Sequence, residues 1–228
     1  MVSIDIRDKR RNIEAVIFDM DNTFFDFIQA KIIACEKVTE RIGRNDGQEL
    51  LNYFLRDDVN FEDVECIADY LKDRDSYDEE IFQECCKIYE DIKLNTIELY
   101  DGVEETLEDL KNMGLKLAVV SNAGKEHVKS RLNKTGLTRF FETVVSRDET
   151  KKAKPDPEPI LSALNVLGVS PKKALMVGDS IQRDIKPGEK LGMVTAYAQY
   201  GDRNSESEEH VEPDIRLSNI KKLNSLLQ

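Results

Sequence analysis

EAVIFDMDNT, residues 14–23, gives the clearest indication of the fold class. Residues 15–18 are apolar, with two β-branched side chains among them, and such a run favours a buried strand. Asp19, Asp21 and Asn22 follow at once, and residues of these types favour a turn. The stretch therefore predicts a buried strand that ends in an acidic loop.

Two later stretches repeat this pattern. Residues 115–120 (LKLAVV) run into SNAG, and residues 174–177 (ALMV) run into GDS. Weaker strands are predicted at residues 143–145 and 194–198. Between and after the strands, apolar residues recur three or four apart, which predicts helices over 103–112, 125–134, 157–167, 183–191 and 217–227. Strands that alternate with helices predict an α/β fold, a Rossmann-like doubly wound parallel sheet with helices on both faces.

The segment from residue 26 to residue 98 has a different character. It contains no convincing strand, and its apolar residues follow helical spacing, so it is predicted to be an inserted all-α helical domain of three to five helices. The predicted domains are therefore a core of residues 1–25 and 99–228 and a helical insert of residues 26–98.

Composition limits the classes of partner. The 33 basic and 45 acidic side chains give a net charge of −12, and no long basic run occurs, which disfavours nucleic acid and anionic membranes. The apolar runs are too short for a membrane span, and MVSIDIRDKRRN lacks the apolar centre of a signal peptide, so we expect a cytoplasmic protein. The four cysteines include no CxxC pair, which favours buried thiols over a zinc site or disulfides.

The acidic loop after the first strand is the first candidate site. Asp19 and Asp21 stand two residues apart where the chain leaves the sheet, so their carboxylates can converge. They could share a cation or divide the roles of nucleophile and acid/base catalyst. A plain turn or helix cap is the alternative for an isolated DxD.

Three further clusters lie at later positions where polar residues meet predicted helices. Ser121 and Asn122 precede a helix, where a hydroxyl and free backbone N–H groups suit an anion or an ordinary cap. Lys154 precedes a proline, which holds the chain extended. Asp179 and Asp184 could bind and brace a hard cation, or cap a helix. The ends of parallel strands meet at one edge of a sheet, so these clusters are expected to form one site.

In this order the clusters resemble the motifs of the haloacid dehalogenase-like superfamily, specifically its phosphatases with a helical cap between the first two motifs (subfamily I). The matching residues are Asp19, Asp21 and Thr23 (DxDxT), Ser121, Lys154 before Pro155, and Asp179 with Asp184 (GDSxxxxD). The match covers most of the chain outside the insert.

The resemblance implies a role for each matching residue. Asp19 would be the nucleophile that forms an aspartyl phosphate, Asp21 the acid/base catalyst, and Thr23 the residue that orients Asp21. Lys154 would hold Asp19 and the transferring phosphoryl group. The other expected contacts are Ser121 and Asn122 to phosphate oxygens, and Mg²⁺ held by the Asp19 carboxylate, the Asp21 carbonyl, Asp179 and Asp184.

The predicted function is Mg²⁺-dependent hydrolysis of a small phosphate monoester by a monomer or homodimer. A 2-haloacid dehalogenase would need neither a metal nor Asp21, and a phosphonate-cleaving enzyme would need a distinctive lysine in the insert. A phosphomutase shares all the motifs and stays open, as does a non-catalytic binding protein. The sequence does not select a substrate among phosphoglycolate, triose phosphates and sugar phosphates.

Overall fold

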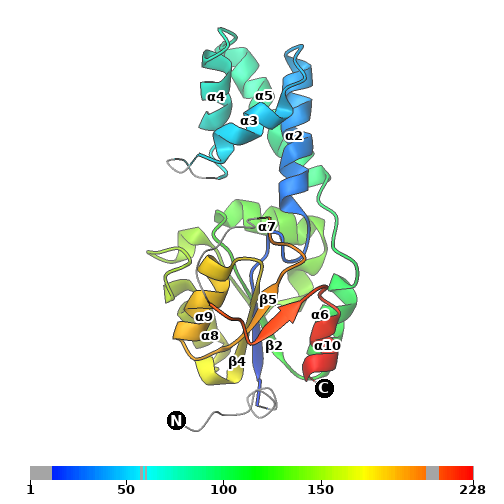
Figure 1. Ribbon diagram of the computed structural model, residues 1–228, viewed down its shortest axis with the longest axis vertical. Helices are drawn as coiled ribbons and strands as arrows, with labels where there is room; N and C mark the ends of the chain where they lie inside the picture. Colours follow the sequence, from blue (N-terminus) through cyan, green and yellow to red (C-terminus); the bar gives the residue numbers. More distant parts are fainter. Residues whose placement is uncertain (1–11, 57–58, 60, 204–210, 228) are drawn as a thin grey trace. The chain divides into compact units, whose positions relative to one another are not determined.

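The computed structural model describes residues 12–56, 59, 61–203 and 211–227 (Figure 1). The chain forms two compact units, one of Met1–Asp26 with Glu98–Gln228 and one of Phe27–Ile97. No helix among the described residues is both long and apolar enough to cross a bilayer.

The first unit is built on a six-stranded sheet in which every neighbouring pair is parallel. The strand order is β3-β2-β1-β4-β5-β6. The strands are β1 (Ala15–Phe18), β2 (Lys116–Val120), β3 (Thr143–Val145), β4 (Ala174–Gly178), β5 (Val194–Ala198) and β6 (Ile215–Leu217). From β1, the chain adds β2 and β3 on one side and then β4, β5 and β6 on the other, so the strand order switches between β1 and β4. Ligands of such sheets bind beyond the carboxyl ends of the strands at this switch point. The predicted Rossmann-like α/β fold class is confirmed.

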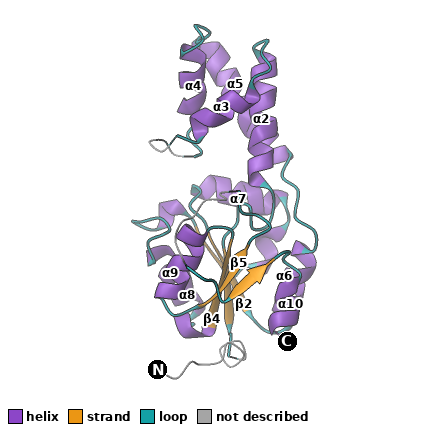
Figure 2. Cartoon of the chain, in the orientation of Figure 1, coloured by secondary structure: helices purple, strands orange, loops and turns teal. Residues whose placement is uncertain are grey.

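The central strands are buried on both faces. All four residues of β1 are fully buried, which explains why the run is continuously apolar. Alternate strand residues, including Ala15, Ile17 and Met176, join Ile160 and Leu164 in one apolar core. Because side chains alternate across a strand, the intervening residues line the opposite face. Helices lie on both sides of the sheet, with α8 and α9 on one side and α6 and α10 on the other (Figure 2).

The helices of this unit follow the predicted order with two differences. Their bounds are α6 (Val103–Asn112), α7 (Lys125–Lys134), α8 (Glu158–Leu167), α9 (Lys186–Lys190) and α10 (Lys222–Leu227). The helix predicted over 183–191 is instead a π-helical turn, Ile181–Ile185, that continues into α9. The helix predicted from residue 217 begins only at Lys222, because Ile215–Leu217 pairs with β5 as a short edge strand.

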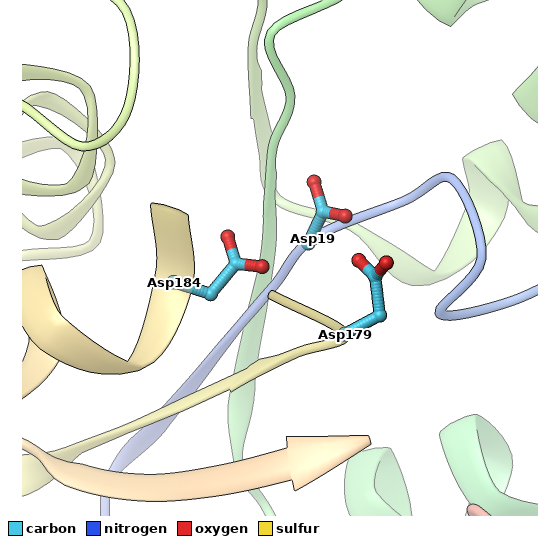
Figure 3. A group of neighbouring side chains, drawn as sticks. All are labelled: Asp19, Asp179 and Asp184. Carbon is cyan, nitrogen blue, oxygen red and sulfur yellow. The ribbon is translucent and has the colours of Figure 1, made fainter. Parts of the chain in front are cut away.

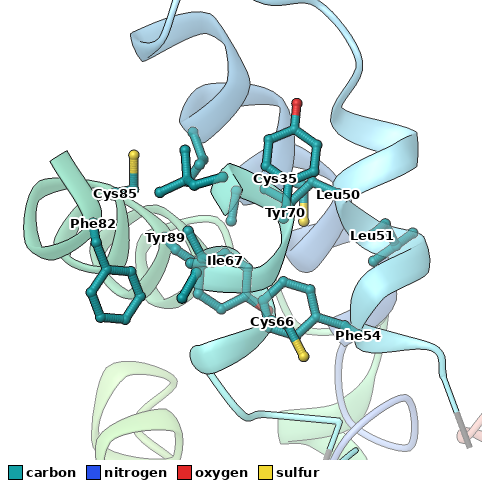
Figure 4. Close-up of a cluster of buried hydrophobic side chains, with 14 residues drawn as sticks. Cys35, Leu50, Leu51, Phe54, Cys66, Ile67, Tyr70, Phe82, Cys85 and Tyr89 are labelled. Carbon is teal, nitrogen blue, oxygen red and sulfur yellow. The ribbon is translucent and has the colours of Figure 1, made fainter. Parts of the chain in front are cut away.

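The described residues of the second unit form helices joined by loops, with no strand among them. It consists of α2 (Phe27–Arg41), α3 (Gly47–Phe54), α4 (Glu65–Lys72) and α5 (Glu79–Asn95). Its own core contains Phe54, Tyr70 and Tyr89, with the rings of Phe54 and Tyr89 stacked at 4.8 Å (Figure 4). Cys35 lies in the same core, where burial raises the pKa of its thiol to about 12. The Cys35 thiol therefore packs as an apolar side chain and is a poor nucleophile.

Candidate active site

Asp19 lies at the carboxyl end of the central strand β1, and its backbone is held by the neighbouring strand β4. It follows β1, and its backbone N–H donates to the carbonyl of Val177 on β4 at 2.8 Å. Asp19 is 8% exposed. The apolar strand therefore fixes the backbone of a carboxylate at the point where the sheet changes direction.

The loop after β1 is a tight turn whose shape depends on a second loop. The N–H of Phe24 donates to the Met20 carbonyl at 3.0 Å, and Asn22 has a φ of 57°, a left-handed conformation. The Tyr200 hydroxyl donates to the Thr23 carbonyl at 2.8 Å. At Gly201, a Cβ atom would lie 1.6 Å from the Asn22 carbonyl oxygen, so only glycine fits there. The loop after β5 thus fixes the backbone around Asp21.

Asp21 and Thr23 have different surroundings. An Asp21 carboxylate oxygen accepts a hydrogen bond from Arg131 Nη1 at 2.8 Å. Thr23 is fully buried, and no hydrogen-bond partner reaches its hydroxyl within the described part of the chain. Arg131 is a site residue that the sequence motifs do not include. The available signal was its spacing from the buried Val128 and Leu132 on α7, which places it on the inward face of that helix.

Lys154 is a buried cation between two carboxylates. Its Nζ donates to Asp19 at 2.6 Å and to Asp184 at 2.7 Å, and its side chain is 1% exposed. Burial alone would lower the pKa of Lys154, but the charges of Asp184 and Asp19 outweigh this effect and raise it. The ammonium group is therefore held in its charged form beside Asp19.

Ser121 and Asn122 lie next to this lysine. Ser121 is buried at the end of β2, and its hydroxyl accepts from the Ala123 N–H at 3.1 Å. The Asn122 amide forms two hydrogen bonds with the backbone of Lys154, donating to its carbonyl at 2.8 Å and accepting from its N–H at 2.9 Å. Asn122 therefore ties the end of β2 to the segment that carries the lysine.

Asp179 and Asp184 complete a group of three buried carboxylates with Asp19 (Figure 3). One oxygen from each of the three lies within 4.8 Å of the others. Asp184 is fully buried, with one oxygen on Lys154 and the other accepting from the Ser180 N–H at 3.1 Å. Gly178 leaves room for it, because a Cβ there would lie 2.4 Å from the Asp184 carboxyl carbon.

The Asp179 carboxylate has the charge environment of a cation ligand. It is 1% exposed, and neither oxygen has a hydrogen-bond donor among the described residues. Burial raises its pKa well above the ordinary value, and the charges of Asp19 and Asp184 raise it further. A buried carboxylate without donors is costly, but the same oxygens suit a hard divalent cation. The residues present therefore fit a metal ion at this position.

Comparisons with known proteins agree with the fold. The family of haloacid dehalogenase-like hydrolases matches residues 16–198. The chain is 29% identical to the pyrophosphatase PpaX of Halalkalibacterium halodurans over 91% of this chain and 94% of that protein. It is 33% identical to a phosphoglycolate phosphatase of Aquifex aeolicus over 82% of this chain and 84% of that one.

A solved structure gives the same fold. The crystal structure of a protein from Haemophilus somnus, described as a predicted phosphoglycolate phosphatase, superposes with a TM-score of 0.76. The superposition covers 95% of this chain and 99% of that chain at 23% identity, so it supports the fold alone. The family match includes the helical unit and the predicted site residues from Asp19 to Asp184. The chain therefore belongs to the haloacid dehalogenase-like hydrolase family.

Proposed function

We propose that this chain is a Mg²⁺-dependent phosphatase that hydrolyses a small phosphate monoester through an aspartyl phosphate on Asp19. The carrying observation is the buried Lys154 between Asp19 and Asp184. Beside it lies the Asp179 carboxylate, which accepts no hydrogen bond from any described residue. A phosphate ester and a carboxylate nucleophile repel each other, so this reaction needs positive charge at the nucleophile.

In the first step, an Asp19 carboxylate oxygen attacks phosphorus and the bond from phosphorus to the ester oxygen breaks. Lys154 balances the negative charge that accumulates on the phosphoryl oxygens. Asp21 donates its proton to the departing oxygen, which leaves as an alcohol. Ser121 and the backbone near Asn122 are the proposed donors to the phosphoryl oxygens.

In the second step, water replaces Asp19 on phosphorus. Asp21, now a carboxylate, takes a proton from the water as its oxygen attacks, and the bond from phosphorus to Asp19 breaks. Inorganic phosphate leaves, and both aspartates regain their starting protonation states. A divalent cation held by Asp19, Asp179 and the Asp21 carbonyl, with Asp184 bracing the site, would stabilise the charge on the transferring group.

The names of relatives and the charge of the site support the proposed substrate class. The relatives act on pyrophosphate or phosphoglycolate by name, and both are small anions with a phosphoryl group. We assign the selection of substrate to side chains of the helical insert, residues 26–98, as a cap. A small phosphorylated metabolite in the cytoplasm is the proposed substrate.

The function is tested by measuring phosphate release from 2-phosphoglycolate, pyrophosphate, sugar phosphates, glycerol phosphate and p-nitrophenyl phosphate, in Mg²⁺ and in EDTA. We expect turnover of at least one monoester in Mg²⁺ and none in EDTA. Full activity in EDTA, or no release from any compound, would contradict the proposal. Halide release from a 2-haloacid or transfer of phosphate between sugar positions would instead identify a dehalogenase or a mutase.

Metal binding is tested by Asp179→Asn. In EDTA we expect this variant to unfold at a temperature a few degrees above wild type, because it removes a buried charge near two others; about 1 kcal/mol corresponds to about 2–4 °C in a chain of this size. In Mg²⁺ we expect wild type to gain stability and the variant to gain little. An equal gain in both proteins would contradict the assigned metal site.

The pH dependence of this difference has a defined sign. The pKa of Asp179 is raised in the folded state, so its ionisation opposes folding, and the associated stability is present at low pH and lost as pH rises through the folded pKa. The advantage of Asp179→Asn in EDTA should therefore shrink as pH falls towards about 4, the pKa of an unperturbed aspartate. Thermal unfolding at several pH values measures it.

A further inference from the structure

Arg131 is a buried arginine that reaches the candidate site from a distant part of the chain. It lies on α7, and its Nη1 donates to Asp21 at 2.8 Å across a sequence separation of 110 residues. The arginine side chain is 2% exposed and that of Asp21 is 21% exposed. The ion pair therefore links a buried guanidinium group to the Asp21 carboxylate, which solvent can reach.

The position of Arg131 on its helix is one that an apolar residue would normally occupy. The buried residues of α7 are Val128, Arg131 and Leu132, and the rest of this very polar helix faces outward or is half-buried. Burying a guanidinium group is unfavourable unless good partners compensate. A leucine at this position would pack without that penalty but could not make the contact with Asp21.

Arg131, unlike the Thr23 hydroxyl, donates a hydrogen bond to the Asp21 carboxylate. Within the described residues, that hydroxyl has no hydrogen-bond partner, whereas the guanidinium contacts the Asp21 carboxylate directly. The backbone at Asp21 is already fixed by the turn, with Gly201 packed against Asn22. The hydrogen bond from Arg131 Nη1 to one Asp21 carboxylate oxygen then opposes rotation of the carboxylate.

We propose that Arg131 is a positioning residue that orients the Asp21 carboxylate towards the leaving-group oxygen. This inference rests on the proposed function, in which Asp21 first gives a proton to the departing oxygen and then takes one from water. Both transfers need the same carboxylate at hydrogen-bond distance from the reacting oxygen. A misplacement of about 1 Å can reduce the rate by about 100-fold.

The test compares two leaving groups in Arg131→Met. p-Nitrophenolate leaves with little need of a proton, whereas the alkoxide of an alkyl monoester such as glycerol phosphate needs one. We expect kcat/KM for the alkyl ester to fall by about 10- to 100-fold and kcat/KM for the aryl ester to fall much less. This parameter reports the steps up to phosphorylation of Asp19, so hydrolysis of the intermediate does not obscure the comparison.

A second variant set separates positioning from general damage. In an Asp21→Asn background, Arg131→Met should cause no further loss, because its effect passes through Asp21. Arg131→Lys retains the charge and should recover part of the activity on the alkyl ester. Lys129→Met removes an exposed cation from the same helix and should leave both substrates unaffected.

Several outcomes would contradict a positioning role for Arg131. An equal loss on both esters that persists in the Asp21→Asn background would overturn the inference, as would wild-type kinetics in Arg131→Met. If Arg131→Met does not fold, equal losses on both esters in Arg131→Lys overturn it instead. Failure of the proposed function is distinct, since wild type would then release no phosphate in Mg²⁺.

Discussion

Asp19→Asn is expected to reduce phosphate release by at least about 10⁴-fold, the largest effect of any single substitution at this site. A carboxamide is a poor nucleophile, and no aspartyl phosphate can form on it. The side chain keeps its shape, and Lys154 retains its contact with Asp184 at 2.7 Å, so the fold should persist.

The loss at Asp19 should come without a loss of stability. Burial raises the pKa of Asp179, and the charges of Asp19 and Asp184 raise it further. Removing the Asp19 charge relieves part of this repulsion, so the metal-free variant should unfold at or above the wild-type temperature. The measurements are phosphate release, trapping of the phosphoenzyme by acid quench, and thermal unfolding. Asp101→Asn is the matched control, because that side chain is 92% exposed. Wild-type turnover in Asp19→Asn would refute covalent catalysis.

Lys154→Met is expected to abolish turnover and also to destabilise the protein, by about 3–5 kcal/mol in EDTA. The methionine fills a similar volume but leaves Asp19 and Asp184 without the cation that lies 2.6 and 2.7 Å from them. Removing one member of a buried ion network leaves the remaining charges uncompensated. The readouts are urea unfolding and phosphate release.

The stability loss of Lys154→Met should depend on pH and on metal. Without the lysine, ionisation of the buried carboxylates opposes folding more strongly, so the deficit should be greatest at neutral pH and shrink towards about pH 4. Mg²⁺ should restore part of the stability by supplying positive charge. Lys152→Met is the control, since its side chain is 62% exposed and pairs with Asp156 at the surface. Equal stability of both variants in EDTA would contradict the assignment.

The sequence was sufficient for the class of fold and for the grouping of the motifs. Buried parallel strands are continuously apolar and end in polar loops, so residues 14–23 and 174–184 are readable without a structure. The parallel sheet then brings those loops to one edge. β6 was missed because three residues, of which the middle one is exposed, give too little pattern to separate a strand from a helix start.

The contact between Arg131 and Asp21 could not be predicted in the same way. Arg131 stands in a segment rich in lysine, where one more cation resembles solvated surface. Its partner depends on how α7 packs, which local pattern does not specify. The same reason applies to Asn122, because its hydrogen bonds with the backbone of Lys154 link segments 32 residues apart.

The strand order also determines when the site can exist during synthesis. Asp19 leaves the ribosome before β4, the strand that pairs with β1 and lies more than 150 residues later. Until Lys154 and Asp184 have emerged, the nascent chain carries this carboxylate without its cation and cannot complete the sheet edge. Contacts so distant in sequence form late. Under the proposed mechanism, the unfinished chain lacks groups needed to act on phosphate esters. The helical unit, Phe27–Ile97, is complete before then and has the opportunity to fold first.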